Sequence, residues 1–372
     1  MSSRIVGLIP QLIFSPTASG DGKSRFMRVA VVPAKKVRGT VRRLREHPRA
    51  FGLGAAGVLK QGNQVACIDW GIARSSHPAG GARLHGVQME SLPGMPLISI
   101  ITATYNAAEH LPKVIKSVRE QTYGNAEWIV VDGASTDRTL DILRQNEDVI
   151  DYWVSEPDKG IYDAWNKGLQ LARGQWICFL GADDFLWNGD VIEKAARVLV
   201  SANPPFRVVY GRVMLIGPTG AHLHAVGEAW TPALKRRFRQ LMSIPHPGTF
   251  HHISLFQDKG GFDAAYRISG DYELLLRELV EHDALFIPEL VTAGMTVNGL
   301  SSTPQNMLRS LKEVRQAQKK NGISWLGPAY VSAYARAWIR DRLWGWVGET
   351  AARRFLDMGR RVMGKPPYWT KT

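Results

Sequence analysis

Cysteine is scarce in this 372-residue chain, which contains only Cys67 and Cys178. Two cysteines support neither a disulfide framework nor a cysteine zinc site, and their scarcity indicates a reducing compartment. The chain also lacks any run of the roughly 18 to 20 apolar residues that a transmembrane helix needs. The apolar stretch at residues 5–14 is interrupted by polar and turn-forming residues, so it does not indicate a signal peptide.

Acidic residues are sparse at both ends of the chain, and the positive charge is confined to those ends. The formal net charge of +14 would by itself suggest a nucleic-acid partner. Residues 1–95 and residues 303–372 each carry 14 Lys and Arg against 4 Asp and Glu, so each end contributes +10. Residues 96–302 hold 19 basic against 25 acidic residues, a net charge of −6. We therefore expect no nucleic-acid partner.

The first 95 residues lack sustained hydrophobic periodicity. They contain Gly/Ser/Pro clusters such as residues 75–81 and the basic stretch Lys35–Arg49, a composition that predicts an irregular, poorly ordered or add-on extension. Met89 and Met95 stand just before the first strong strand, and we hypothesise that the natural start of translation lies at one of them. A mass measurement that finds residues 1–88 in the natural protein would contradict this.

From Leu97 onward, apolar strands alternate with helical stretches. This order is typical of an α/β domain, and we predict a single mixed, mostly parallel sheet flanked by helices. The loops that follow the carboxyl ends of such strands form the usual ligand crevice. The predicted strands are 98–102, 128–131, 152–154 and 176–180, and the predicted helices are 109–121, 137–145 and 160–172.

Two adjacent acids, Asp183 and Asp184, follow the buried-strand pattern of residues 176–180. Two like charges side by side favour a bound cation, and their hard oxygen atoms suit Mg²⁺ or Mn²⁺, which proteins usually share with substrate phosphates. The alternative is a solvated polar turn, because Asp is a common turn residue.

A third acid, Asp132, ends the predicted strand 128–131. An acid in this position can accept hydrogen bonds from ribose hydroxyls or a base edge. Helix capping explains the next polar residues, Ser135, Thr136 and Asp137, but not Asp132.

Four motifs in this order resemble the family 2 glycosyltransferases of the GT-A fold, in the branch that builds bacterial capsular, exopolysaccharide or glycolipid sugars. The resemblance covers residues 96–302 and includes the segment 298–302. Its motifs are Ser99–Asn106, Val130–Asp137, Glu156–Asp163 with Asn166–Gly168, and Gly181–Asp184, followed by His246–Phe250, Gly261–Asp263 and Ser269–Leu274.

The resemblance implies a nucleotide-sugar donor and a divalent metal, Mn²⁺ or Mg²⁺, that neutralises charge on the departing diphosphate. Asp184 would ligate the metal, with Asp183 near the ribose. Tyr105 and Asp132 would line the base and ribose. The remaining residues expected beside the nucleotide are Thr104, Asn106 and Asp158.

The same resemblance assigns Asp271 as the base that takes the proton from an acceptor hydroxyl during inverting transfer. Asp271 precedes an apolar-rich helical stretch at residues 272–279. The alternative is that it only caps this helix. We expect the acceptor to be a growing glycan or a lipid-linked sugar.

Histidines at 246, 251 and 252 raise the question of a second metal site. Histidine clusters can bind zinc, but no third and fourth ligand appear here at a recognisable spacing. We expect His246 to line the acceptor side or to make an extra contact to the metal or diphosphate; the alternative is an ordinary loop histidine. Trp165 and Trp187 could stack on sugar rings, but Trp165 falls in a helical pattern typical of a core residue, and neither is assigned to the site.

The basic C-terminal extension, residues 303–372, has a helical pattern and holds five of the twelve tryptophans. Aromatic and cationic side chains together suit an acidic lipid surface, so we predict peripheral contact of residues 320–372 with the inner face of the cell membrane. The alternative is a helix packed on the catalytic domain.

The sequence thus predicts an irregular extension (1–95), a GT-A domain (96–302) and a helical tail (303–372), which together form a cytoplasmic hexosyltransferase-type enzyme of class EC 2.4. One alternative is a non-catalytic scaffold that acts through its basic ends, which would have no use for Asp271 and the acid pair together. A nucleotidyltransferase would carry a Gly-rich, basic loop near the first strand, and residues 104–107 form no such loop.

Overall fold

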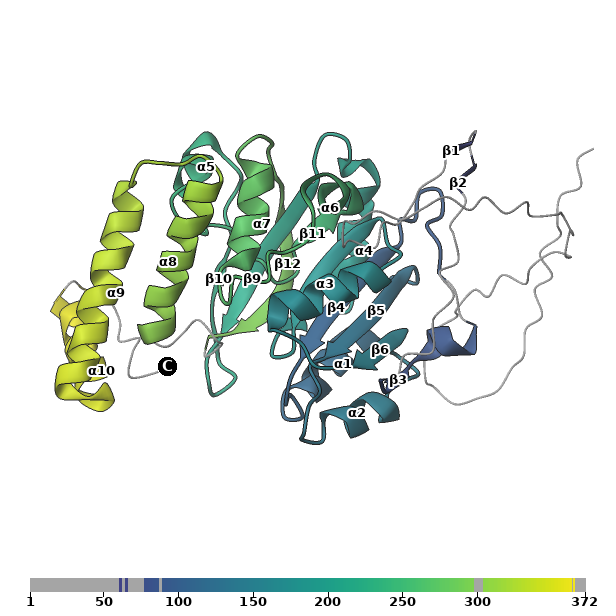
Figure 1. Cartoon of the computed structure of the whole chain (residues 1–372), viewed down its shortest axis with the longest axis horizontal. Coiled ribbons are helices and arrows are strands. Elements are labelled where there is room, and N and C mark those ends of the chain that lie inside the picture. The colour runs from purple at the N-terminus through teal and green to yellow at the C-terminus, as the bar shows by residue number, and fades with distance from the viewer. Residues whose placement is uncertain are drawn as a thin grey trace, which may run out of the picture.

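The computed structural model describes residues 60–61, 64–65, 77–86, 89–297, 304–362 and 364. Most of the predicted N-terminal extension and the segment 298–302 lie outside these residues. Within the described part, one mixed sheet has helices on both faces, and three C-terminal helices stack beyond one of its ends (Figure 1). This agrees with the fold class expected from the sequence.

Ten described strands form the main sheet in the order β3-β6-β5-β4-β7-β11-β9-β12-β8, with β10 paired to β9. Two-residue strands β1 (Lys60–Gln61) and β2 (Gln64–Val65) pair separately. The bounds of the main strands are β3 Ala79–Gly80, β4 Ile98–Thr104, β5 Ala126–Asp132, β6 Tyr152–Ser155, β7 Trp176–Gly181, β8 Phe185–Leu186, β9 Val208–Ile216, β10 His222–Val226, β11 Phe250–His252 and β12 Leu285–Thr296.

Strands β6, β5, β4 and β7 are parallel neighbours and form the part of the sheet that carries the predicted motifs. Their register aligns Thr104 with Asp132, and Asp132 with Ser155, while Ala103 lies opposite Gly181. The carboxyl ends of four strands therefore meet at one edge. Antiparallel β11 joins this group to the parallel pair β9 and β12.

The three helices predicted between the first strands are present as α1 (Leu111–Arg119), α2 (Thr139–Gln145) and α3 (Ile161–Leu171). Each observed helix is shorter than its predicted range at one or both ends. At α2 the reason is local: the Asp137 carboxylate accepts hydrogen bonds from the backbone N–H and the hydroxyl of Thr139, so Asp137 stands before the helix.

Both faces of the sheet are buried, which explains why its strands read as continuous apolar runs. Side chains alternate between the faces, so Ile101 joins a core cluster with α3 and α7 (Gly270–Leu279). Its neighbour Ile100 joins the opposite cluster with α1 and α4 (Val191–Ala202). Burying a large apolar side chain is worth about 1.5–3 kcal/mol, so these two clusters supply much of the stability.

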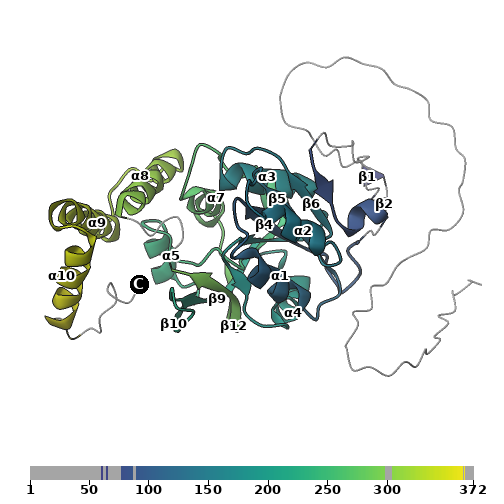
Figure 2. The same ribbon diagram turned by 90° about the horizontal axis from the view of Figure 1, so that it is seen from below.

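The predicted helical extension is confirmed as α8 (Pro304–Lys320), α9 (Pro328–Val347) and α10 (Glu349–Val362), and α9 lies between the other two helices in Figures 1 and 2. Leu311, Val314 and Ala317 of α8 share a core cluster with Leu274 and Leu275 of α7. The core thus continues past residue 302, and the division at that point remains a prediction. Among the described helices, none is both long and apolar enough to span a bilayer.

Two short helices complete the second half of the domain. They are α5 (Pro232–Phe238) and α6 (Ile253–Lys259). Near the start of the described chain, the single-turn 3-10 helix Ala82–His85 places Arg83 against the buried carboxylate of Glu127.

Candidate active site

Asp132 organises the carboxyl edge of the parallel strands. It is fully buried, and each of its two carboxylate oxygens accepts two hydrogen bonds. The hydroxyls of Thr104 (3.0 Å) and Ser155 (2.6 Å) donate from the neighbouring strands. Ser135 donates through its backbone N–H (2.9 Å) and its hydroxyl. Asp132 therefore fixes the loop after β5 to the strand ends, and its predicted contact with the nucleotide remains a prediction.

Asn106 joins the first two loops of this edge. Its side-chain oxygen accepts from the backbone N–H of Thr136 (2.9 Å), and its own N–H donates to the Ser135 hydroxyl (2.8 Å). Its φ of 47° lies in the left-handed region, where non-glycine residues are uncommon. A rare backbone conformation held by two hydrogen bonds indicates a loop with a fixed shape.

Tyr105, Asp158 and Gly133 border one space beside this loop. A methyl group added at Gly133 would lie 2.5 Å from an Asp158 carboxylate oxygen and 3.4 Å from the Tyr105 ring. Tyr105 is 66% exposed, so its ring is free to take a ligand. Asp158 accepts a hydrogen bond from the backbone N–H of Gly160 (2.7 Å). The structure thus places Tyr105 and Asp158 around one space beside the loop after β5, and their contact with a base or ribose remains a prediction.

The acid pair after β7 faces Gly181. A methyl group added there would lie 2.8 Å from an Asp184 carboxylate oxygen and 3.0 Å from an Asp183 oxygen. Asp184 is buried, with 7% exposure. Burial, followed by the neighbouring charge of Asp183, raises the pKa of Asp184 to about 8. Ionising Asp184 is therefore unfavourable, because the carboxylate is buried beside a second acid. A bound cation would stabilise the ionised form.

A divalent metal fits this pair. Mg²⁺ and Mn²⁺ need only one or two protein carboxylates when water and phosphate oxygens complete the coordination shell. In the part of the chain that the structure describes, no three His, Cys, Asp or Glu side chains converge on one point. The residue that would hold the ion is Asp184, with Asp183 beside it, and water and a diphosphate would supply the remaining oxygen ligands.

Asp271 is the second residue of α7 and is partly buried. Its Oδ1 accepts hydrogen bonds from the Tyr272 backbone N–H (2.8 Å) and the Tyr162 hydroxyl (3.3 Å). Burial raises the pKa of Asp271 to about 6, although both hydrogen bonds lower it. A carboxylate with this pKa is ionised at neutral pH and is a stronger base than an exposed aspartate.

Gly270 allows the contact between Tyr162 and Asp271. A methyl group added at Gly270 would lie 2.8–2.9 Å from three atoms of the Tyr162 ring. Tyr162 stands at the start of α3 and is buried. Tyr162 and Gly270 both lie within the sequence motifs. Only the fold shows that Tyr162 packs on Gly270 and contacts Asp271.

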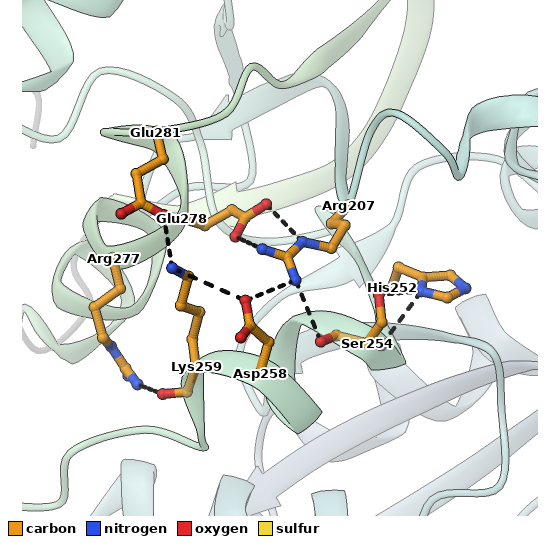
Figure 3. A network of polar contacts seen from close by, with 8 residues as sticks. All are labelled: Arg207, His252, Ser254, Asp258, Lys259, Arg277, Glu278 and Glu281. Atoms are coloured by element: carbon orange, nitrogen blue, oxygen red, sulfur yellow. Dashed lines mark hydrogen bonds and ion pairs between the residues drawn. The ribbon is translucent and has the colours of Figure 1, made fainter.

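The far end of α7 is fixed by the network of charged side chains in Figure 3. Arg207 binds both oxygens of Glu278 and also contacts Asp258 on α6 (3.1 Å). Lys259 of α6 donates to Glu281 (2.7 Å), and Arg277 donates to the Gly261 carbonyl (2.7 Å). Because Glu278 is almost fully buried, this pairing holds α7 firmly against α6 and β9.

His246 lies in the aromatic core, with its ring 5.2 Å from Trp165 and 5.8 Å from Phe179. It is buried, and its Nε2 has no hydrogen-bond partner among the described residues. Burial lowers its pKa well below the ordinary value, which keeps the ring neutral. The role of His246 at the metal or acceptor remains a prediction. Trp165 is a buried core residue, as expected.

Comparison with known proteins identifies the family of this chain. The family model "Glycosyl transferase family 2" matches residues 99–259. A PGL/p-HBAD biosynthesis glycosyltransferase of Mycobacterium tuberculosis is 33% identical over 222 residues, covering 56% of this chain and 80% of that protein. A putative teichuronic acid biosynthesis glycosyltransferase of Bacillus subtilis is 37% identical over 114 residues, covering 30% and 45%. The structure of Staphylococcus aureus TarS with UDP aligns at 17% identity and a TM-score of 0.49, covering 71% and 77%.

The mixed, mostly parallel sheet flanked by helices is the GT-A fold that the sequence predicted. The chain belongs to glycosyl transferase family 2, as the family model and the identity to the mycobacterial relative show.

Proposed function

We propose that the protein transfers a sugar from a metal-bound nucleoside-diphosphate sugar to a hydroxyl group, with inversion at the anomeric carbon. One observation carries this proposal. The acid pair beside Gly181 and the partly buried Asp271 stand on separate elements, and burial raises the pKa of both Asp184 and Asp271. Separate acids are what an inverting transfer requires, because one group holds the leaving diphosphate through a cation and another accepts a proton.

Asp271 is the proposed general base. It takes the proton of the acceptor hydroxyl as the acceptor oxygen bonds to the anomeric carbon and the bond from that carbon to the diphosphate oxygen breaks. Its pKa of about 6 keeps it ionised at neutral pH and close to the optimum for a base. When bound, Mn²⁺ or Mg²⁺ at Asp184 neutralises charge on the diphosphate.

The nucleotide is proposed to lie along the edge formed by Thr104, Tyr105, Asn106 and Asp132. The exposed Tyr105 ring suits stacking on a base, and Asp158 lies across the same space. Asp183, beside Asp184, is proposed to face the ribose. His246 is proposed to lie on the acceptor side, where its neutral ring would border the metal or diphosphate.

The acceptor is proposed to be a growing surface glycan or a lipid-linked sugar, and the transferred group a hexose. The names of the mycobacterial and Bacillus relatives refer to PGL/p-HBAD biosynthesis and to teichuronic acid biosynthesis. These names support the proposed class of acceptor.

Contact with a membrane surface is proposed for α9 and α10. Tyr330 and Ala337 turn one side of α9 into the core, yet Trp338, Ile339 and Trp346 are 48%, 57% and 84% exposed. Arginines stand among these exposed residues. Apolar and cationic groups together favour an acidic lipid surface, and the scarcity of cysteine supports the reducing, cytoplasmic face of the membrane.

A screen of nucleotide sugars tests the proposed function. The protein is mixed with UDP-glucose, UDP-N-acetylglucosamine or GDP-mannose, with and without Mn²⁺, and both thermal stabilisation and release of the nucleoside diphosphate are measured. We expect at least one donor to stabilise the protein in a Mn²⁺-dependent way. A scaffold without catalytic function would release no nucleoside diphosphate from any donor.

A further inference from the structure

A single carboxylate from the C-terminal extension holds the loop that leads into α7. Glu313 of α8 accepts hydrogen bonds from three successive backbone N–H groups: Arg267 (3.1 Å), Ile268 (2.8 Å) and Ser269 (2.9 Å). Its side chain is only 11% exposed. Consecutive N–H groups that converge on one anion form a strong backbone binding site, so the loop shape depends on this carboxylate.

Other contacts keep Glu313 in place. The hydroxyls of Ser310 and Ser269 lie 2.8 Å apart, one turn of α8 from Glu313. At the end of the same helix, Lys320 forms an ion pair with the buried Glu273 of α7 (3.0 Å). Together with the apolar contacts of α8 in the core, these bonds leave the Glu313 carboxylate little freedom to move.

The loop connects Glu313 directly to the proposed base. The Ile268 N–H donates to Glu313, and the Ile268 carbonyl accepts from the Tyr162 hydroxyl (2.7 Å). The single hydrogen of this hydroxyl is shared with Asp271, whose Oδ1 lies 3.3 Å from the phenol oxygen. The peptide groups that precede Asp271 are therefore held from both sides, by α8 and by α3. The negative charge of Glu313 also adds to the rise in the pKa of Asp271, whose largest cause is burial.

We propose that Glu313 is a positioning residue for the transfer reaction: its carboxylate fixes residues 267–269 so that Asp271 is aimed at the acceptor hydroxyl. This rests on the proposed role of Asp271 as the base. Glu313 lies outside both the segment of resemblance, 96–302, and the family match, 99–259. In this role Glu313 makes the start of the C-terminal extension part of the active site.

The test compares wild type with Glu313→Gln, Glu313→Ala, Asp271→Asn and the control Lys312→Gln, all in the full chain. Lys312 is the exposed neighbour of Glu313 on α8. Release of nucleoside diphosphate from UDP-glucose, UDP-N-acetylglucosamine and GDP-mannose gives kcat, the KM for the donor and the pH profile. Amide hydrogen exchange of a peptide covering residues 262–272 reports the loop directly.

We expect Glu313→Gln to lower kcat about tenfold and Glu313→Ala about 100-fold, because small misplacement of a catalytic group is costly. The KM for the donor should change less than kcat, since Glu313 binds the loop before Asp271 directly. Glu313 reaches the nucleotide edge one step further on, through the Arg267 side chain that donates to the Lys159 carbonyl beside Asp158. Removing the charge should also move the acidic limb of the pH profile of Glu313→Gln to lower pH. Exchange at residues 267–269 should rise, while Lys312→Gln should match wild type.

If wild type is active and Asp271→Asn is inactive, the proposed function stands. Two results would then overturn the positioning role of Glu313. One is a Glu313→Gln protein with wild-type kcat, pH profile and loop exchange. The other is a loss of kcat in proportion to a loss of folded protein, with the pH profile unchanged. If Glu313→Ala does not fold, Glu313→Gln decides, because it keeps the side-chain shape and one acceptor oxygen. A wild-type protein that turns over none of the donors would overturn the proposed function and this role together.

Discussion

The hydroxyl of Tyr162 donates a hydrogen bond to the carboxylate of Asp271 across 3.3 Å. This bond lowers the pKa of Asp271, against the larger opposing effect of burial, and the result is a pKa of about 6. The base therefore stands between two environments: an apolar core that favours its neutral form and a phenol that favours its charged form.

Tyr162→Phe should shift the pH dependence of the reaction. Without the hydroxyl, the pKa of Asp271 rises above about 6, so a larger fraction of the base is protonated near neutral pH. We expect the acidic limb of kcat/KM to move to higher pH and activity to recover in alkaline buffer. This is opposite to the shift expected for Glu313→Gln. A limb that moves to lower pH would contradict the assignment of Asp271 as the group that titrates.

Gly181→Ala should weaken metal-dependent activity. The added methyl group would lie within 3.0 Å of oxygen atoms from both Asp183 and Asp184, so at least one carboxylate must turn away. We expect the Mn²⁺ concentration for half-maximal activity to rise about tenfold or more. Gly124→Ala is a matched control, because nothing lies within 4 Å of its added methyl group. Equal metal dependence in both variants would argue against the acid pair as the metal site.

Asp184→Asn should separate metal binding from folding. The substitution replaces a buried carboxyl group, whose pKa is raised to about 8 by burial and by the neighbouring Asp183, with a neutral amide of the same shape. In EDTA we therefore expect a melting temperature equal to or above that of wild type. With Mn²⁺ and a nucleotide sugar, wild type should gain stability and the variant should not. Scanning calorimetry measures both melting temperatures. A similar rise in the melting temperature of wild type and Asp184→Asn would show that the metal binds elsewhere.

Exposed aromatic residues of α9 should govern binding to lipid. Trp338→Ser with Trp346→Ser removes two of its large exposed side chains and leaves buried Tyr330 in the core. We expect less of the double variant than of wild type to float with vesicles that contain phosphatidylglycerol. The difference should be larger at high salt, because salt screens the electrostatic attraction and leaves binding to the apolar contacts. Val200→Ser on α4 is the control, at 49% exposure. Equal flotation of the double variant and the control would support a helix that only packs on the domain.

The sequence predicted the strands and loops that carry the site because their signals are local. A buried run followed by two acids indicates where Asp183 and Asp184 lie, and parallel strands bring such loops to one edge. Contacts between distant segments had no such signal. Glu313 reads as one acid among basic residues on a helix, and only the fold shows that it binds residues 267–269.

Asp132 illustrates the same limit within a motif. The sequence identified it as an acid at a strand end, but could not show that neighbouring donors occupy both of its oxygens. Tyr162 likewise lies within a recognised motif, yet its bond to Asp271 depends on the close approach of α3 to Gly270. Specific partners are set by tertiary packing, which periodicity and spacing do not encode.

The most direct test of the account compares wild type with Asp271→Asn in Mn²⁺-containing buffer, using a nucleotide sugar that stabilises wild type. Binding is followed by thermal shift and turnover by release of the nucleoside diphosphate. The account predicts that Asp271→Asn binds the donor as tightly as wild type but loses about 10²- to 10⁴-fold in kcat. Wild-type turnover by Asp271→Asn, or equal loss of binding and turnover, would contradict its role as the catalytic base.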